Sequence, residues 1–240
     1  SDRVRTSRKM VLEFLASSAD LSLASSDVQR WLGEYGCDPS RYGAPAPDRP
    51  AGERDATRPG EHQHEVTGAA AETVAQPVKY DNEAYVRDYA RCILCYKCVE
   101  ACGEDAQNTF AIAVAGRGFD ARISTEFDVT LPDSACVYCG NCIAVCPTGA
   151  LMAKTEFDKR ADGTWDASRM TATDTICPYC GVGCTLRLHV DHDEIIKATS
   201  PLENSITQGN LCIKGRFGWR YVQNGAPVDA APAGTGDGSH

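Results

Sequence analysis

Twelve of the thirteen cysteines in this 240-residue chain fall into three tight groups, and this pattern constrains the fold more than any other feature. Two groups share the run C-x2-C-x2-C-x3-C, at residues 92–102 and 136–146. The third has the spacing C-x2-C-x3-C-x27-C, over residues 177–212. Such spacings suit metal coordination better than the closure of loops by disulfides. The chain is therefore expected to fold around metal centres.

The repeated run is typical of a protein that holds two [4Fe–4S] clusters. Two residues between successive cysteines let three sulfurs converge on one cluster. The fourth cysteine, three residues on, is expected to begin a helix that points away and reaches the other cluster. The predicted ligands are Cys92, Cys95, Cys98 and Cys146 for the first cluster, and Cys136, Cys139, Cys142 and Cys102 for the second. β-Branched residues at matching places in the two runs indicate an internal duplication.

Two other interpretations of the cysteines are weaker. A secreted disulfide scaffold is disfavoured because the first residues, SDRVRTSRKM, lack the apolar core of a signal peptide. A pair of zinc sites is disfavoured because zinc proteins rarely carry four cysteines in this run twice over. No apolar segment approaches the roughly 18 residues of a membrane span, and a net charge of −9 argues against nucleic-acid binding. We expect a cytoplasmic protein.

Local patterns predict an α+β chain of several modules. Apolar residues at helical spacing predict helices within 1–42, including Met10, Val11, Phe14 and Leu15. Five prolines and few large apolar residues predict a flexible linker over 43–78, and residues 224–240 are predicted to be a disordered tail. The remaining predictions are a helix over 81–90, a strand within 109–118, a hairpin-like turn at 159–165, and a β-hairpin formed by 185–190 and 194–198.

Residues 79–158 resemble the two-cluster ferredoxin domain found inside larger redox enzymes. Around the third cysteine group, the sequences CPYCGVGC and LCIKGRFGW resemble the opening domain of molybdopterin oxidoreductases, particularly NAD-linked formate dehydrogenases. The resemblance implies a third [4Fe–4S] cluster, within residues 159–223, held by Cys177, Cys180, Cys184 and Cys212. It also implies that Lys214, two residues beyond the last cysteine, lies in the electron path between this cluster and a pterin.

Residues 1–42 resemble a helical segment of the same family that binds a cluster through one His and three Cys. Here the stretch ASSADLSLASS carries neither residue type, and Ser26 stands about where the last of those cysteines would fall. We therefore expect a degenerate scaffold without a cluster, and Cys37 as a lone buried thiol. His189, on a strand, and His192, in a turn, have no second ligand at useful spacing.

Taken with the family's chemistry, the resemblance implies an oxidoreductase component that conducts electrons and carries no catalytic residue of its own. Its three [4Fe–4S] clusters would connect a Mo- or W-bis-pterin catalytic subunit with a flavin/[2Fe–2S] subunit linked to NAD(P). The alternative is a subunit of an NADH-dehydrogenase-like or hydrogenase-like complex. The chain begins where the family's N-terminal [2Fe–2S] domain normally ends, which leaves open whether such a domain precedes residue 1.

Overall fold

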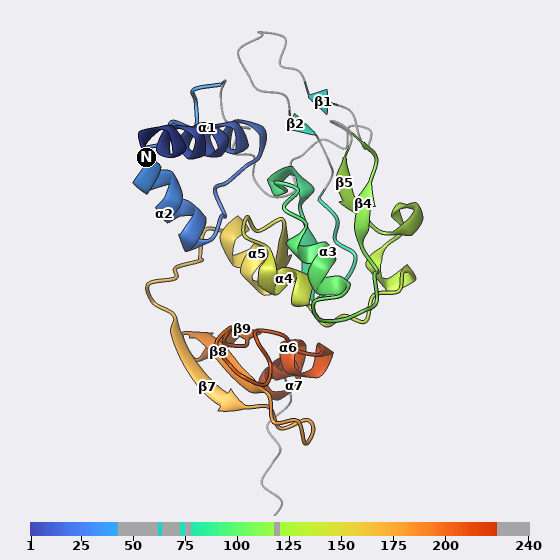
Figure 1. The fold of residues 1–240 in the computed structure, drawn as a ribbon. Coiled ribbons are helices and arrows are strands. Elements are labelled where there is room, and N and C mark those ends of the chain that lie inside the picture. The colour runs from blue at the N-terminus through green and yellow to red at the C-terminus, as the bar shows by residue number, and fades with distance from the viewer. Residues whose placement is uncertain (43–61, 64–72, 75–77, 118–120, 225–240) are drawn as a thin grey trace, which may run out of the picture.

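The computed structural model describes residues 1–42, 62–63, 73–74, 78–117 and 121–224. Most of the predicted linker over 43–78 lies outside these residues, and so does the predicted tail apart from its first residue. Within the linker, the described residues form a short antiparallel pair, β1 (His62–Gln63) with β2 (Thr73–Val74). The chain contains both helices and strands (Figure 1), which confirms the mixed helix and strand class.

The N-terminal unit consists of two helices, α1 (Asp2–Ser18) and α2 (Ser26–Tyr35), as predicted. The face of α1 that is buried differs from the expected apolar stripe, since Val11 and Phe14 are about half exposed. Glu13 is fully buried instead. Its carboxylate accepts the backbone N–H of Asp38 at 3.0 Å and pairs with Arg41 at 3.3 Å. An ion-pair network with the chain beyond α2 therefore decides which face of α1 turns inward.

The central unit has the internal symmetry that the duplicated cysteine runs predict. In each half a strand precedes the cysteine run, a helix overlaps its end, and a strand follows. The two outer strands pair with each other, as do the two inner strands, both antiparallel. Its elements are β3 (Tyr85–Arg87), η1 (Tyr89–Arg91), α3 (Lys97–Cys102), β4 (Ala113–Ala115), β5 (Arg122–Ser124), η3 (Glu126–Asp128), η4 (Leu131–Asp133), α4 (Asn141–Val145), β6 (Leu151–Ala153) and α5 (Lys154–Ala161).

Three local predictions in this unit are wrong. The helix expected over 81–90 is β3 followed by η1, because β3 pairs with the distant β6 and buries all three of its residues. The hairpin-like turn expected at 159–165 is shorter than predicted: residues 159–161 belong to α5, a helix supported by ion pairs such as Lys154–Asp158, and the turn covers 162–163. The fourth cysteine of each run ends a helix rather than beginning one: Cys102 is the last residue of α3, and Cys146 directly follows α4.

The C-terminal unit is a three-stranded antiparallel sheet followed by two short helices. Its elements are β7 (Thr171–Ile176), β8 (Thr185–Asp191), β9 (Glu194–Thr199), α6 (Ile213–Phe217) and α7 (Trp219–Asn224), with the sheet order β7-β8-β9. The predicted hairpin of β8 and β9 is confirmed. Strand β7 lies at an edge of the sheet and is exposed throughout, so its sequence, TATDTI, lacks the apolar alternation that would have predicted it.

Polar contacts join the central unit to both of the other units. Towards the N-terminal unit, Arg91 forms an ion pair with Asp20 at 2.6 Å, and within the central unit it pairs with Asp88 at 2.9 Å. Towards the C-terminal unit, Asn141 accepts the backbone N–H of Leu211 at 3.0 Å. The central unit therefore anchors both neighbours. Among the helices that the structure describes, none is long and apolar enough to cross a membrane.

Candidate functional site

The first predicted set of thiols comes together beside β3 and α3. Cys98 is buried, and its pKa is raised to about 12, first by burial and then by the neighbouring thiols of Cys92, Cys146 and Cys95. Burial likewise raises the pKa of Cys92 to about 11, with smaller contributions from Cys146 and Cys95. Cys95 is exposed. The structure thus gathers all four members of this set, with one at the surface.

The second predicted set surrounds Cys142. Burial raises the pKa of Cys142 well above its ordinary value, and the thiols of Cys139, Cys98, Cys136 and Cys102 raise it further. Three of these four belong to the second set, while Cys98 belongs to the first. The two sets are therefore neighbours inside the central unit. This is the arrangement expected when each half of a duplication lends its fourth cysteine to the other half.

Tyr85 connects the core of the central unit to the second set. Its hydroxyl lies 3.1 Å from the Sγ of Cys136, and burial raises the pKa of this tyrosine. Its ring stacks on Phe217 from α6 at 6.1 Å between centroids. The same side chain therefore contacts a predicted ligand and the helix that follows the last cysteine of the third set.

The third predicted set lies at the surface of the C-terminal unit. Cys177 is buried and donates its backbone N–H to the carbonyl of Cys184 at 2.7 Å, whereas Cys180 and Cys212 are exposed. The pKa of Cys184 is raised, mostly by burial and then by the thiols of Cys177, Cys180 and Cys212. Lys214, at the start of α6, is also exposed. Cys180, Cys212 and Lys214 are therefore accessible at the surface, and Val182 (59% exposed) is a large apolar residue in the loop that contains Cys180.

Backbone amides of the loops point at the cysteine sulfurs in both halves of the central unit. Leu94 donates its N–H to the Sγ of Cys92, and Tyr138 donates to the Sγ of Cys136, each at 3.4 Å. Leu94 and Tyr138 occupy matching places in the duplicated run, and both have positive φ, +52° and +56°. A non-glycine residue adopts this conformation at a cost, so a cluster of such residues at a site indicates function.

The chemistry of these thiol sets fits iron–sulfur clusters. Ligation requires thiolates, and a thiolate that is buried among other thiolates is unfavourable unless cations offset its charge. Amide hydrogen bonds to the sulfurs are among the features that adjust cluster potentials. Among the described residues, no three His, Cys, Asp or Glu side chains converge closely enough to hold a single metal ion. A cluster does not require that convergence, because each thiolate binds a different iron.

The cysteine and histidines that were not predicted to bind metal lie apart from the three cysteine sets. Cys37, predicted to be a lone buried thiol, is only partly buried, and its Sγ lies 3.9 Å from the carbonyl of Lys9. Burial raises its pKa, and no cysteine contributes. His189 lies on β8 with its Nε2 2.8 Å from the hydroxyl of Thr199, and His192 is exposed in the turn. Neither histidine joins a thiol set.

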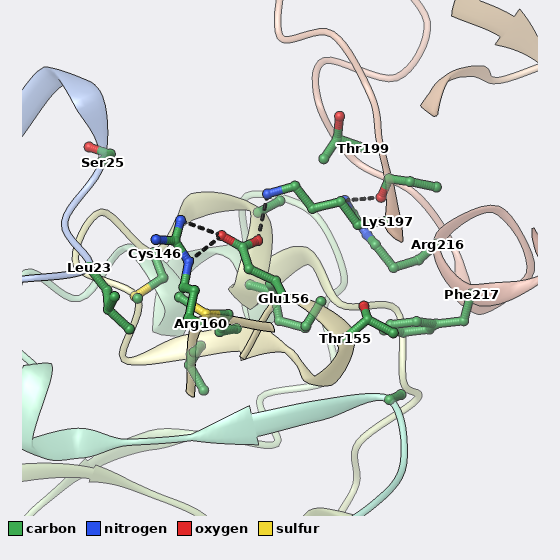
Figure 2. Close-up of a pocket in the computed structure, with 18 of the residues that line it drawn as sticks. Leu23, Ser25, Cys146, Thr155, Glu156, Arg160, Lys197, Thr199, Arg216 and Phe217 are labelled. Atoms are coloured by element: carbon green, nitrogen blue, oxygen red, sulfur yellow. Dashed lines mark hydrogen bonds and ion pairs between the residues drawn. The ribbon is translucent and has the colours of Figure 1, made fainter. Parts of the chain in front are cut away.

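A cavity of about 320 Å³ opens where the three units meet (Figure 2). Figure 2 shows Glu156 between two cations, Arg160 at 2.8 Å and Lys197 at 2.5 Å. Burial alone would raise the pKa of Glu156, but these two cations hold it below its ordinary value. Ser26 and Cys146 also line this space. The cavity therefore carries paired charges beside a predicted ligand, and sequence reasoning did not single out any of its charged residues.

Two parts of the chain match known domain families. Residues 91–150 match the 4Fe-4S dicluster domain, and residues 170–224 match the Molybdopterin oxidoreductase Fe4S4 domain. These matches confirm the ferredoxin-like and molybdopterin-oxidoreductase resemblances that the cysteine motifs indicated. The chain thus contains domains of families that bind [4Fe–4S] clusters.

Similar proteins include several large redox proteins. The chain is 37% identical over 135 residues to an NADH-quinone oxidoreductase component of Rhizobium meliloti, covering 56% of this chain and 15% of that protein. It is 36% identical over 148 residues to the alpha chain of the NADPH-Fe(3+) oxidoreductase of Geobacter sulfurreducens, covering 61% and 16%. A putative formate dehydrogenase of Staphylococcus haemolyticus is 28% identical over 190 residues, covering 62% and 19%.

The chain therefore spans less than one fifth of the length of these relatives. Among solved structures, an NAD⁺-reducing [NiFe]-hydrogenase in the H₂-reduced state is similar with a TM-score of 0.46 and 23% identity. That similarity covers 64% of this chain and 56% of the hydrogenase chain.

Proposed function

We propose that this chain, with its dicluster domain followed by a molybdopterin oxidoreductase Fe4S4 domain, is the electron-transfer part of a formate dehydrogenase-like complex. The observation that carries the proposal is that the thiols within each of the three predicted sets lie close enough to raise one another's pKa. Each set would hold one [4Fe–4S] cluster. The ligands would be Cys92, Cys95, Cys98 and Cys146; Cys136, Cys139, Cys142 and Cys102; and Cys177, Cys180, Cys184 and Cys212.

When bound, such clusters supply one-electron redox chemistry without proton transfer by the protein. The protein's own residues set the conditions for it. Leu94 and Tyr138 direct amide N–H groups at ligand sulfurs, and these bonds favour the charged thiolate form. Tyr85 covers Cys136 and helps to keep water from the second set. The three sets together would form a conducting path through the chain.

The outer ends of the path would face partners. The exposed face around Cys180, Cys212 and Lys214 would receive electrons from a Mo- or W-bis-pterin centre in a catalytic part of the complex. At the other end, Cys95 is exposed and would face a flavin/[2Fe–2S] subunit linked to NAD(P). Both exposed ends are consistent with a component of a multi-subunit oxidoreductase.

A second candidate is a component of an NADH-dehydrogenase-like complex. It is favoured by the 37% identity to the NADH-quinone oxidoreductase component of Rhizobium meliloti. The two candidates differ in the centre that would face the third cysteine set. A large co-purifying partner that contains molybdenum or tungsten pterin and oxidises formate would favour the first candidate. A partner assembly that oxidises NADH and contains no pterin would favour the second.

The decisive experiment is an iron and spectral analysis of the chain purified without oxygen. Three clusters predict about twelve irons per chain and EPR signals of S = 1/2 after reduction. Replacing Cys142 by Ser should remove or alter one signal and leave that of the third set. The matched control is Cys37→Ser, in a cysteine that lies outside the three sets. A colourless protein that contains zinc and no iron would contradict the proposal.

A further inference from the structure

The guanidinium of Arg216 is buried at the junction between the central and C-terminal units. Its side chain is only 5% exposed. It donates to the carbonyls of Cys139 at 3.4 Å, Ala198 at 3.4 Å and Gly209 at 3.5 Å, and to Oδ1 of Asn141 at 3.2 Å. A positive charge is therefore held in place by four neutral oxygen atoms from both units.

Among the residues that the structure describes, no carboxylate contributes to the pKa of Arg216. An isolated buried charge costs several kcal/mol unless an opposite charge lies near. Burial lowers the pKa of Arg216 to about 10, and the thiols of Cys139 and Cys142 act in the opposite direction. Arg216 is therefore held against the loop of the second cysteine set, whose thiols become negatively charged thiolates when they bind iron.

The surrounding contacts place Arg216 between the second and third sets. It lies on α6, four residues beyond Cys212, and binds the loop that contains Cys139. Asn141, in the same loop, accepts the N–H of Leu211, the residue before Cys212. The packing is close, because a Cβ atom at Gly140 would lie 2.9 Å from Cγ of Arg216. The second set, rather than the first, adjoins the third.

We propose that Arg216 is the fixed counter-charge of the cluster held by the second set, and that it raises the reduction potential of this cluster. The inference rests on the proposed function. A cluster gains one negative charge when it accepts one electron, and a fixed cation stabilises the reduced form more than the oxidised form. The cluster of the second set would then be the first acceptor of electrons that leave the third.

The test compares variants of the intact chain loaded with its clusters, in redox titrations followed by EPR. Arg216→Gln removes the charge, and Arg216→Lys keeps it. The matched control is Arg220→Gln, because Arg220 is a half-buried arginine nearby whose guanidinium donates to the backbone carbonyl of Glu83. A signal that is altered by Cys136→Ser identifies the second cluster.

We expect Arg216→Gln to lower the equilibrium constant for reduction of the second cluster about tenfold, a fall of about 59 mV for one electron. Arg216→Lys and Arg220→Gln should leave this potential near that of the wild type, and the third cluster should shift less. An unchanged potential in Arg216→Gln would overturn the proposal. An equal fall in Arg216→Lys would also overturn it, because geometry rather than charge would then be responsible.

If Arg216→Gln loses iron, the iron content of Arg216→Lys still tests the proposal. If Arg216→Lys then retains all its iron and the wild-type potential, the charge itself stabilises the cluster, as proposed. If both variants lose iron, the cluster depends on the hydrogen bonds of Arg216 to both units and not on its charge, and the proposal fails. A wild-type chain without iron would refute the proposed function instead, so the two failures are distinguishable.

Discussion

Replacing Arg91 by Met should release the N-terminal helices from the central unit. Arg91 is 4% exposed and directly precedes Cys92. Its guanidinium pairs with Asp20 at 2.6 Å and with Asp88 at 2.9 Å, and donates to the hydroxyl of Ser22 at 2.7 Å. Both carboxylates are buried, so the substitution removes one buried cationic partner from each of them.

The size of the effect follows from these distances. At an effective dielectric constant of 20, a pair of charges 2.6 Å apart attracts with about 6 kcal/mol before desolvation is counted. Desolvation offsets part of this, and removing one partner of a buried pair typically costs about 3–5 kcal/mol. The equilibrium for detaching α1 and α2 should therefore shift by roughly two to four orders of magnitude, at 1.36 kcal/mol for each factor of ten.

Hydrogen exchange followed by mass spectrometry measures this equilibrium directly. Amides in α1 and α2 should exchange much faster in Arg91→Met, while amides of β8 and β9 remain protected. The matched control is Arg30→Met, because among the described residues Arg30 forms ion pairs only with exposed carboxylates on α2, and its loss should not change protection in α1. Unchanged exchange in α1 and α2 of the Arg91 variant would refute the reasoning.

Three further predictions concern single side chains. Cys37→Ser should leave the iron content unchanged, since Cys37 lies outside the three sets; an iron assay that finds four irons missing would contradict this. Lys214→Ala should keep its cluster but slow electron flow from a pterin-containing partner, measured by stopped-flow, and an unaltered rate would discredit the assigned path. Burial lowers the pKa of His189 to about 4, so the folded state favours the neutral ring. Stability should therefore fall as pH drops from about 6.5 towards 4, and His189→Gln should flatten this part of a denaturation series; an equal slope would refute it.

Patterns that depend on neighbouring residues could be predicted from the sequence. The cysteine spacings indicated the two matched domains, and alternation indicated the hairpin of β8 and β9. These features are local, because a loop between cysteines or a tight turn is built from a few consecutive residues. The helices of the N-terminal unit were predictable for the same reason.

Features that depend on distant partners were missed. The local sequence of β3 predicts a helix, but these residues form a strand because they pair with β6, over sixty residues away. Glu13 would be expected at the surface, yet Asp38 and Arg41 allow its burial. In the same way, nothing about Arg216 in the sequence indicates burial, because its acceptors come from loops as distant as Cys139. The burial of a charged residue cannot be predicted from the local sequence when its partners lie far away along the chain.

The exchange of fourth cysteines between the two halves of the central unit has a consequence for biosynthesis. In the proposed assignment, the first cluster has three ligands in the run at 92–102, but its fourth ligand, Cys146, is synthesised later. The second cluster has only one ligand, Cys102, in that first run, and its other three ligands lie in the run at 136–146. Neither cluster can be completed on a ribosome until both runs have emerged from the exit tunnel. Until then, the early thiols are open to oxidation or to the wrong metal. Cells that make this protein would therefore benefit from delivering iron and sulfide only after synthesis has passed the second run.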